Sequence, residues 1–394
     1  MFSWINKPNL YTLGWCIYFY QGILFPDGFV AIKLMMVVLL VVSLYYVFIA
    51  NTQYKIPAYL MGLNALLSLF TVYGLYLIII PYDYNPVPGS EFLKQIYVSL
   101  LPIYAFYVFS KEGRINEKSV QIWAIFFITL TIVYYFASER TLLRNAILAK
   151  INKTEFTNNI GYLFTALIPL SLFFKKRVLL LYVILGTCFV FTIMAMKRGA
   201  IIIGVICIML VLWNALKTSN IKTKISIMIL LFILFVVGAK FVEYKMETSD
   251  YFINRIEQTS EGNASGRDRL FSAYLNYFLD DASPSQFFLG SGANYTMQMI
   301  GYAHNDWLEI AVNHGLLGVL CFIFYWSMFA KTAWVGRLKK TESLVMQIVF
   351  IDFFLRTFFS MSYREMHVVS QLILGYSLTK EIRDEQVIYS NHTV

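Results

Sequence analysis

Long apolar segments separated by short polar connectors repeat along almost the whole chain. Most have about the 17–25 residues that a helix needs to cross a bilayer. We place about twelve of them, at roughly 10–25, 29–50, 57–80, 92–110, 120–138, 159–174, 178–196, 199–216, 225–242, 316–333, 344–361 and 365–380. Because 58% of the 394 residues are hydrophobic and 14% are charged, this pattern predicts an all-α, polytopic integral membrane protein. We expect one transmembrane domain over residues 1–394 and no separate soluble domain.

Charged connectors predict how the helices are oriented. Short basic connectors follow alternate predicted helices, at residues 111–118, 175–177, 217–224 and 331–340. The positive-inside rule therefore places these connectors and both termini in the cytoplasm. Alternation then places residues 139–159, the junction 196–198 and the long polar interval 243–303 on the outer side, so 243–303 is the large extracytoplasmic loop.

Other polar groups add less to this picture. The formal net charge of +9 accompanies the topology and does not indicate a nucleic-acid partner. The four cysteines lie inside apolar segments, which predicts small buried side chains and not disulfides or a metal site. Asp352 and Arg356 have i,i+4 spacing within an apolar segment, which predicts a neutralised structural pair.

The long polar interval leads into an unusual stretch, residues 290–318. The D-x-x-E spacing of Asp306 and Glu309 predicts a helix that begins near Asp306, with Asp306 in a capping role. His304 and Asn305 then lie on a loop, with side chains not used for capping. The helix either ends near His314, which would be a cation at a helix C-terminus, or continues into the next apolar segment.

Several cations remain on the predicted outer side, where topology does not require them. They are Arg140, Arg144, Lys150, Lys153, Lys197, Arg198, Arg255, Arg267, Arg269 and Arg364. A guanidinium matches phosphate oxygens in a bidentate way, so a cluster of them suits an anionic ligand. A solvated loop arginine is the simpler explanation for most single positions. It is weaker for Arg198, which lies in a tight turn between two apolar segments.

Three short motifs follow one another on this face. They are Met196-Lys197-Arg198-Gly199-Ala200, Ser265-Gly266-Arg267-Asp268-Arg269, and a Gly-x-Gly followed by His304-Asn305 and His314-Gly315-Leu316-Leu317-Gly318. In this order, over residues 197–318, they resemble the bacterial O-antigen polymerase and O-antigen ligase superfamily.

The resemblance implies a glycosyltransferase that needs no metal, cofactor or nucleotide sugar. The donor would be a glycan on an undecaprenyl pyrophosphate carrier and the acceptor a sugar hydroxyl. Arg198, Arg267 and Arg269 would hold the pyrophosphate and offset charge on the leaving group. His304 would accept the proton of the attacking hydroxyl, although an imidazole that only hydrogen-bonds its loop is the alternative. Asn305 and Glu309 would contact substrate, or Asn305 would orient His304.

The function expected first is a polymerase that joins lipid-linked repeat units into O-antigen or a related surface polysaccharide. It would act on the outer side of the bacterial inner membrane, with flippase and chain-length regulator proteins as partners. The alternatives are a ligase that transfers glycan to lipid A-core and a non-enzymatic flippase or transporter. A transporter should carry polar residues through the middle of many helices, whereas here they gather at one face.

Overall fold

The computed structural model describes residues 6–25, 29–81, 87–148, 158–218, 220–249, 252–254, 257, 267–360 and 362–380, which form helices joined by loops. The predicted all-α class is confirmed. The count of about twelve spans is not. Among the described residues, seven helical segments are long and apolar enough to cross a membrane: Val30–Gln53, Ala58–Ile79, Gly89–Lys111, Glu117–Asn145, Arg198–Thr218, Ile221–Thr248 and Asp306–Val335. The apolar helices Gly161–Phe174, Val178–Met194 and Val368–Ser377 are shorter.

The first half of the chain forms α1 (Lys7–Phe19), α2 (Gln21–Leu24), α3 (Val30–Gln53), α4 (Ala58–Ile79), α5 (Gly89–Leu100), α6 (Pro102–Lys111) and α7 (Glu117–Leu148). Local sequence explains where two of these helices begin. The Asn6 side chain accepts a hydrogen bond from the amide of Asn9 and caps α1. Pro102 is the first residue of α6, where its missing amide hydrogen costs nothing.

The second half forms α8 (Gly161–Leu167), the 3-10 helix η2 (Ile168–Phe174), α9 (Val178–Met194), α10 (Arg198–Thr218), α11 (Ile221–Thr248), α13 (Arg267–Asn276), the π-helix η3 (Tyr277–Asp281), α14 (Pro284–Leu289), α15 (Tyr295–Met299), α16 (Asp306–Ala330), the π-helix η4 (Lys331–Val335), α17 (Lys340–Phe359) and α18 (Val368–Ser377). Helices α7 and α11 run past their predicted ends, so part of each predicted polar interval is helical.

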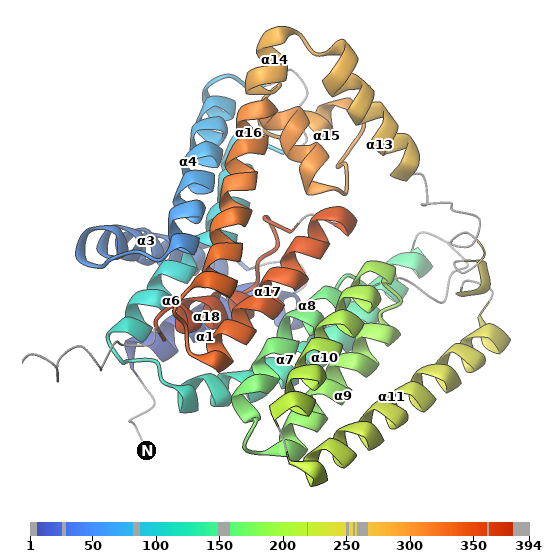
Figure 1. The fold of residues 1–394 in the computed structure, drawn as a ribbon. Helices are drawn as coiled ribbons and strands as arrows, with labels where there is room; N and C mark the ends of the chain where they lie inside the picture. Colours follow the sequence, from blue (N-terminus) through green and yellow to red (C-terminus); the bar gives the residue numbers. More distant parts are fainter. Residues whose placement is uncertain are drawn as a thin grey trace, which may run out of the picture.

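Helices α4 and α16 lie side by side along one flank of the molecule (Figure 1). The short helices α13, α14 and α15 pack around the end of α16 that begins at Asp306. On the other flank, α9 and α10 pack together and α11 lies outermost. α11 is the least buried of the seven long apolar segments and exposes Phe232 and Phe235. Such a surface suits contact with lipid.

The predicted Asp352–Arg356 pair is present and buried. Arg356 donates from Nε to Asp352 Oδ1 at 3.1 Å and from Nη2 to Asp352 Oδ2 at 2.6 Å. The same guanidinium donates to the carbonyl of Tyr162, and Thr165 donates to the Asp352 carboxylate. The pair therefore joins α17 to α8, and its charges are matched within the protein.

Candidate functional site

The turn before α10 brings the first motif to the end of α17. Met196 has a φ of 49°, and α10 begins at Arg198. A Cβ at Gly199 would collide with the Tyr162 hydroxyl and would lie 2.9 Å from Cβ of Phe359. The predicted tight turn is confirmed. Glycine after Arg198 lets the start of α10 approach α8 and the last residue of α17 this closely.

The side chain of Arg267, in α13, also lies at the C-terminal end of α17. Its Nη1 donates to the carbonyl oxygen of Phe359 at 3.0 Å, at the C-terminal end of α17. Phe359 therefore adjoins both Gly199 and Arg267, and two motifs that are far apart in the sequence meet there. Ser265 and Gly266 of the second motif lie outside the described residues.

Arg269 does not share this position. It is exposed and lies two residues further along α13. Residues two apart on a helix point away from each other. The part of the structure that is described therefore brings Arg267 to the end of α17 while Arg269 points elsewhere. A role for Arg269 in holding substrate stays a prediction.

His304 is exposed on a loop that is fixed on both sides. Its φ of 53° is in the left-handed region, which is uncommon for a residue with a side chain. The preceding amide, of Ala303, donates to Glu309 Oε2 at 2.9 Å. The following residue, Asn305, accepts hydrogen bonds from the amides of Trp307 and Leu308 at 3.0 and 3.2 Å. The backbone that carries the imidazole is thus fixed on both sides.

Two capping predictions are wrong. The helix does begin at Asp306, but its cap is Asn305, because an extended backbone at that residue lets the side chain reach two free amides of the first turn. Asp306 is buried instead, and its carboxylate accepts from the amide of Ser362 at 2.9 Å and from the Ser362 hydroxyl. Asp306 therefore ties α16 to the connector that follows α17.

Glu309 lies beneath the His304 loop and is fully buried. It accepts from the Thr296 hydroxyl at 2.5 Å and from Asn313 Nδ2 at 3.2 Å, besides the Ala303 amide. These bonds tie residues 296–303 to the first turns of α16. We therefore expect Glu309 to support the loop that carries His304, and direct contact of Glu309 with substrate stays a prediction.

Gly290 and Gly315 pack backbone to backbone. Their φ angles are 76° and 62°, and a Cβ on either would collide with the backbone of the opposite segment. The amides of Ser291 and Gly292 donate to the carbonyls of Val312 and Asn313 at 3.0 and 2.9 Å. α16 is broken at Gly315 yet continues to Ala330. Both alternatives for the end of this helix are thus partly correct.

His314 is not a cation at a helix C-terminus. The helix continues beyond it, and its ring is fully buried between aromatic side chains. The ring centroids of Tyr73 and Phe70 lie 4.6 and 5.3 Å away. An imidazole buried among aromatic rings is not an exposed cation at a helix end, so this interpretation is wrong.

We expect Gly315→Ala to destabilise the protein by at least about 1 kcal/mol, since alanine disfavours positive φ and its methyl group would displace Gly290. Gly186→Ala is the matched control, because nothing lies within 4 Å of a Cβ at Gly186. Thermal unfolding of the two purified variants in detergent provides the measurement. Equal midpoints for both variants would contradict this account of the Gly-x-Gly segment.

Partial burial and nearby cations both favour the neutral form of His304. Partial desolvation lowers the pKa of His304 below its usual value, and the positive charges of Arg267 and Lys197 lower it further. The neutral imidazole, which can accept a proton, is therefore the main form at neutral pH. Lys197 is part of the first motif, but sequence reasoning assigned it no role beside His304.

The connector between α17 and α18 adds a residue that sequence reasoning left without a role. The Arg364 side chain is 3% exposed, and its Nη2 lies 3.9 Å from Glu309 Oε1. Among the described residues, neither Nη1 nor Nη2 has a hydrogen-bond partner. The guanidinium also lies over the rings of Phe92 and Tyr302, at 5.0 and 5.4 Å. In the sequence, Arg364 was one of the outer-side cations that topology does not require, without a specific partner.

Comparison with known proteins agrees with the sequence motifs. Residues 180–323 match the family model described as O-antigen ligase. This segment contains Arg198, Arg267 and His304, so the match supports the resemblance to the O-antigen ligase and polymerase superfamily at the positions that carry it. No curated protein matches the chain.

Proposed function

We propose, from the O-antigen ligase match over residues 180–323 and from the charges around His304, that this membrane protein is a glycosyltransferase. It takes a glycan from a polyprenyl pyrophosphate carrier and joins repeat units of a surface polysaccharide. The observation that carries the proposal is that Arg267 and the turn at Gly199 meet at Phe359, where the charges of Arg267 and Lys197 also act on one exposed imidazole, His304. Fixed cations beside a neutral base suit an anionic donor and a hydroxyl acceptor.

In the proposed reaction, the bond that breaks, the bond that forms and the proton that moves can each be assigned. The acceptor oxygen attacks the anomeric carbon, and the bond from that carbon to the pyrophosphate oxygen breaks. The acceptor proton passes to His304, and the carrier leaves as its pyrophosphate. Arg198 and Arg267 bind the pyrophosphate oxygens and offset the charge that develops on them. Asn305 and Glu309 act mainly by fixing the loop on which His304 lies.

A ligase is the second candidate, and the description of the matched family favours it. Both reactions use the same donor and the same leaving group, so the gathered residues serve either. They differ in the acceptor, which is another carrier-linked chain for the polymerase and lipid A-core for the ligase.

Surface glycans of a deletion strain distinguish the candidates. For a polymerase, we expect lipopolysaccharide that carries single repeat units. Full-length polymer that stays on its carrier would identify a ligase and contradict the polymerase proposal. Repeat units that accumulate on the inner side would identify a transporter and contradict both transferase proposals.

The proposed reaction requires helices α13–α15 to face outward. A cysteine in place of Asp281, an exposed residue between α13 and α14, should react with an impermeant thiol reagent in intact spheroplasts. A cysteine in place of Lys176, exposed in the basic connector before α9, should react only after lysis. The unsubstituted chain gives the background from its own cysteines. The opposite labelling pattern would reverse the topology.

A further inference from the structure

A cavity of about 490 Å³ lies at the end of α10 and α17 far from His304. α10 begins at Arg198 beside the candidate site and ends at Thr218, which lines the cavity. α17 begins with Lys340 in the cavity wall and ends at Phe359 beside Arg267. α10 has 21 residues, which corresponds to roughly 30 Å of helix. The cavity therefore lies on the opposite membrane face, among the connectors that we expect in the cytoplasm.

Three helix N-termini converge on this cavity. Val178 begins α9, Asn220 caps α11, and Lys340 and Thr341 begin α17, and all four line the wall. The helices have 17, 28 and 20 residues. Each helix start carries the positive end of a helix dipole and amide hydrogens without a partner in the helix, although Asn220 already accepts from the Thr223 amide of α11. Their convergence favours an anion.

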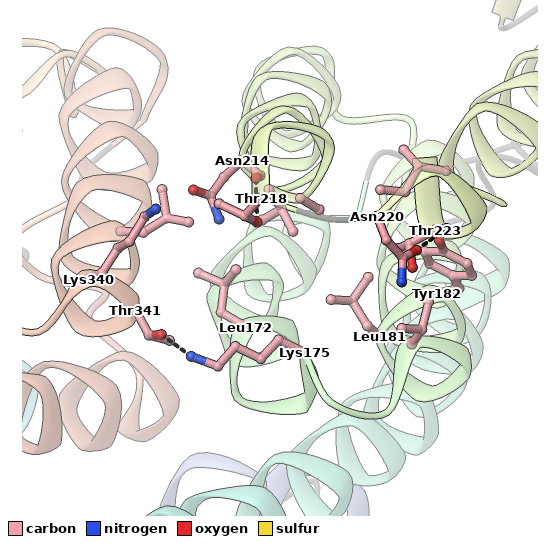
Figure 2. Close-up of a pocket in the computed structure, with 15 residues that line it drawn as sticks. Leu172, Lys175, Leu181, Tyr182, Asn214, Thr218, Asn220, Thr223, Lys340 and Thr341 are labelled. Carbon is pink, nitrogen blue, oxygen red and sulfur yellow. Dashed lines mark hydrogen bonds between the residues drawn. The ribbon is translucent and has the colours of Figure 1, made fainter. Parts of the chain in front are cut away.

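Two lysines add full charges to these partial ones. Lys175 and Lys340 line the cavity, and Lys175 Nζ donates to Thr341 Oγ1 at 2.5 Å (Figure 2). None of the described residues in the wall carries a carboxylate. Neither lysine forms an ion pair within the described part of the chain. The nearest acid along α17, Glu342, acts on Tyr376 and Lys380 instead.

The remaining wall has two kinds of side chain. Asn214 and Thr218 from α10 and Thr223 from α11 are polar (Figure 2), and the hydroxyl of Tyr182 is buried with no hydrogen-bond partner among the described residues. Leucine, isoleucine, valine and alanine side chains form the rest of the wall. Further around α11, on the side turned away from the cavity, Ile225, Met228 and Phe232 line an exposed apolar groove with Lys224 beside them. α11 thus contributes both to a polar, cationic cavity and to a surface suited to acyl chains.

We propose that this cavity binds the phosphate group of an anionic phospholipid from the adjacent leaflet. The phosphate would lie between Lys175, Lys340 and the helix N-termini, with the acyl chains along α11. A soluble phosphate would use the same cations. The apolar groove on α11 favours the lipid, because only a lipid gains from covering it.

The test compares variants of equal charge in the purified full chain. Lys175→Gln with Lys340→Gln removes the two cations of the cavity. Lys176→Gln with Lys339→Gln removes two exposed cations from the same connectors, neither of which lines the cavity. Ala215→Phe keeps both cavity lysines and fills the space. Each protein is placed in phosphatidylcholine bilayers with and without phosphatidylglycerol, and bound lipid is measured by native mass spectrometry.

We expect the unsubstituted chain and the Lys176/Lys339 control to retain phosphatidylglycerol. The Lys175/Lys340 variant should bind it about tenfold more weakly or worse, since each cation beside a lipid phosphate contributes measurably. Ala215→Phe should reduce binding as well. This variant tests the cavity independently if the double variant fails to fold. Equal losses in both double variants, or normal binding by Ala215→Phe, would overturn the proposal.

A second experiment distinguishes a phospholipid headgroup from free phosphate as the ligand. Inorganic phosphate is added to the chain in phosphatidylcholine alone, and thermal stability is followed. We expect no stabilisation at concentrations at which phosphatidylglycerol stabilises the protein. Stabilisation by inorganic phosphate and not by phosphatidylglycerol would show that the ligand is soluble and would overturn the lipid assignment.

Discussion

Replacing His304 with glutamine should lower turnover by about 10²–10⁴-fold, the usual contribution of a general base. Glutamine keeps a polar group of similar reach but cannot take the proton from the acceptor hydroxyl. Because His304 is exposed and its neighbours Ala303 and Asn305 hold the loop, the substitution should leave the fold intact. Binding of carrier-linked glycan should survive. Steady-state assays with carrier-linked repeat units, together with the amount of protein in the membrane, provide the measurement.

The pH dependence gives an independent check. The base must be neutral, so activity should fall as pH drops through the pKa of His304. Desolvation and the neighbouring cations lower that pKa, which places the acid limb below the usual value of about 6.5. Lys197→Gln removes one of those cations and should move the limb to higher pH. If His304 only donates a hydrogen bond to substrate, the glutamine variant should be active and the limb absent.

Arg267→Lys should reduce activity by about 10²-fold, the scale of losing one donor that stabilises charge in the transition state. In the structure, Nη1 of Arg267 is already bonded to the Phe359 carbonyl. The remaining guanidinium donors can still form a fork toward phosphate oxygens. A lysine ammonium is a point charge, so it cannot hold the helix end and match two oxygens together. Arg198→Lys should also reduce activity, because lysine lacks the bidentate guanidinium group.

The control is Arg177→Lys, the same change at an exposed position in the connector before α9. It should leave activity normal. All three variants should reach the membrane in normal amounts, which immunoblotting of membrane fractions checks. Full activity of both Arg198→Lys and Arg267→Lys would remove the argument that these residues hold a pyrophosphate.

The structure confirms the predicted helical class but not the predicted count of about twelve spans, and the difference has a physical reason. Apolar composition reports that a segment avoids water, and protein can replace lipid around it. α18 shows this clearly, because all ten of its residues are buried inside the protein. It is as apolar as a span but too short to be one. Counting apolar segments therefore does not separate crossings from helices that are buried within the protein.

The sequence predicted the local conformation of the motifs but not their tertiary contacts. The turn at Arg198 followed from a local pattern, and the structure has it. The role of Asp306 did not, since its partner Ser362 lies 56 residues away and only the tertiary fold brings the two together. The burial of Arg364 beside Glu309 has the same origin. Local spacing could identify the polar groups at this face but not their partners.

The bond between Arg267 and Phe359 uses a main-chain oxygen, and this has a consequence for how the protein can change during evolution. Residue 359 can exchange its side chain without removing the acceptor. The length of α17 is under a stricter constraint. One residue inserted between Asp352 and Phe359 would move the acceptor by about 1.5 Å along the helix and turn it by roughly 100°. We expect homologous chains to vary in composition at this helix end while keeping a fixed number of residues between the buried ion pair and the last turn.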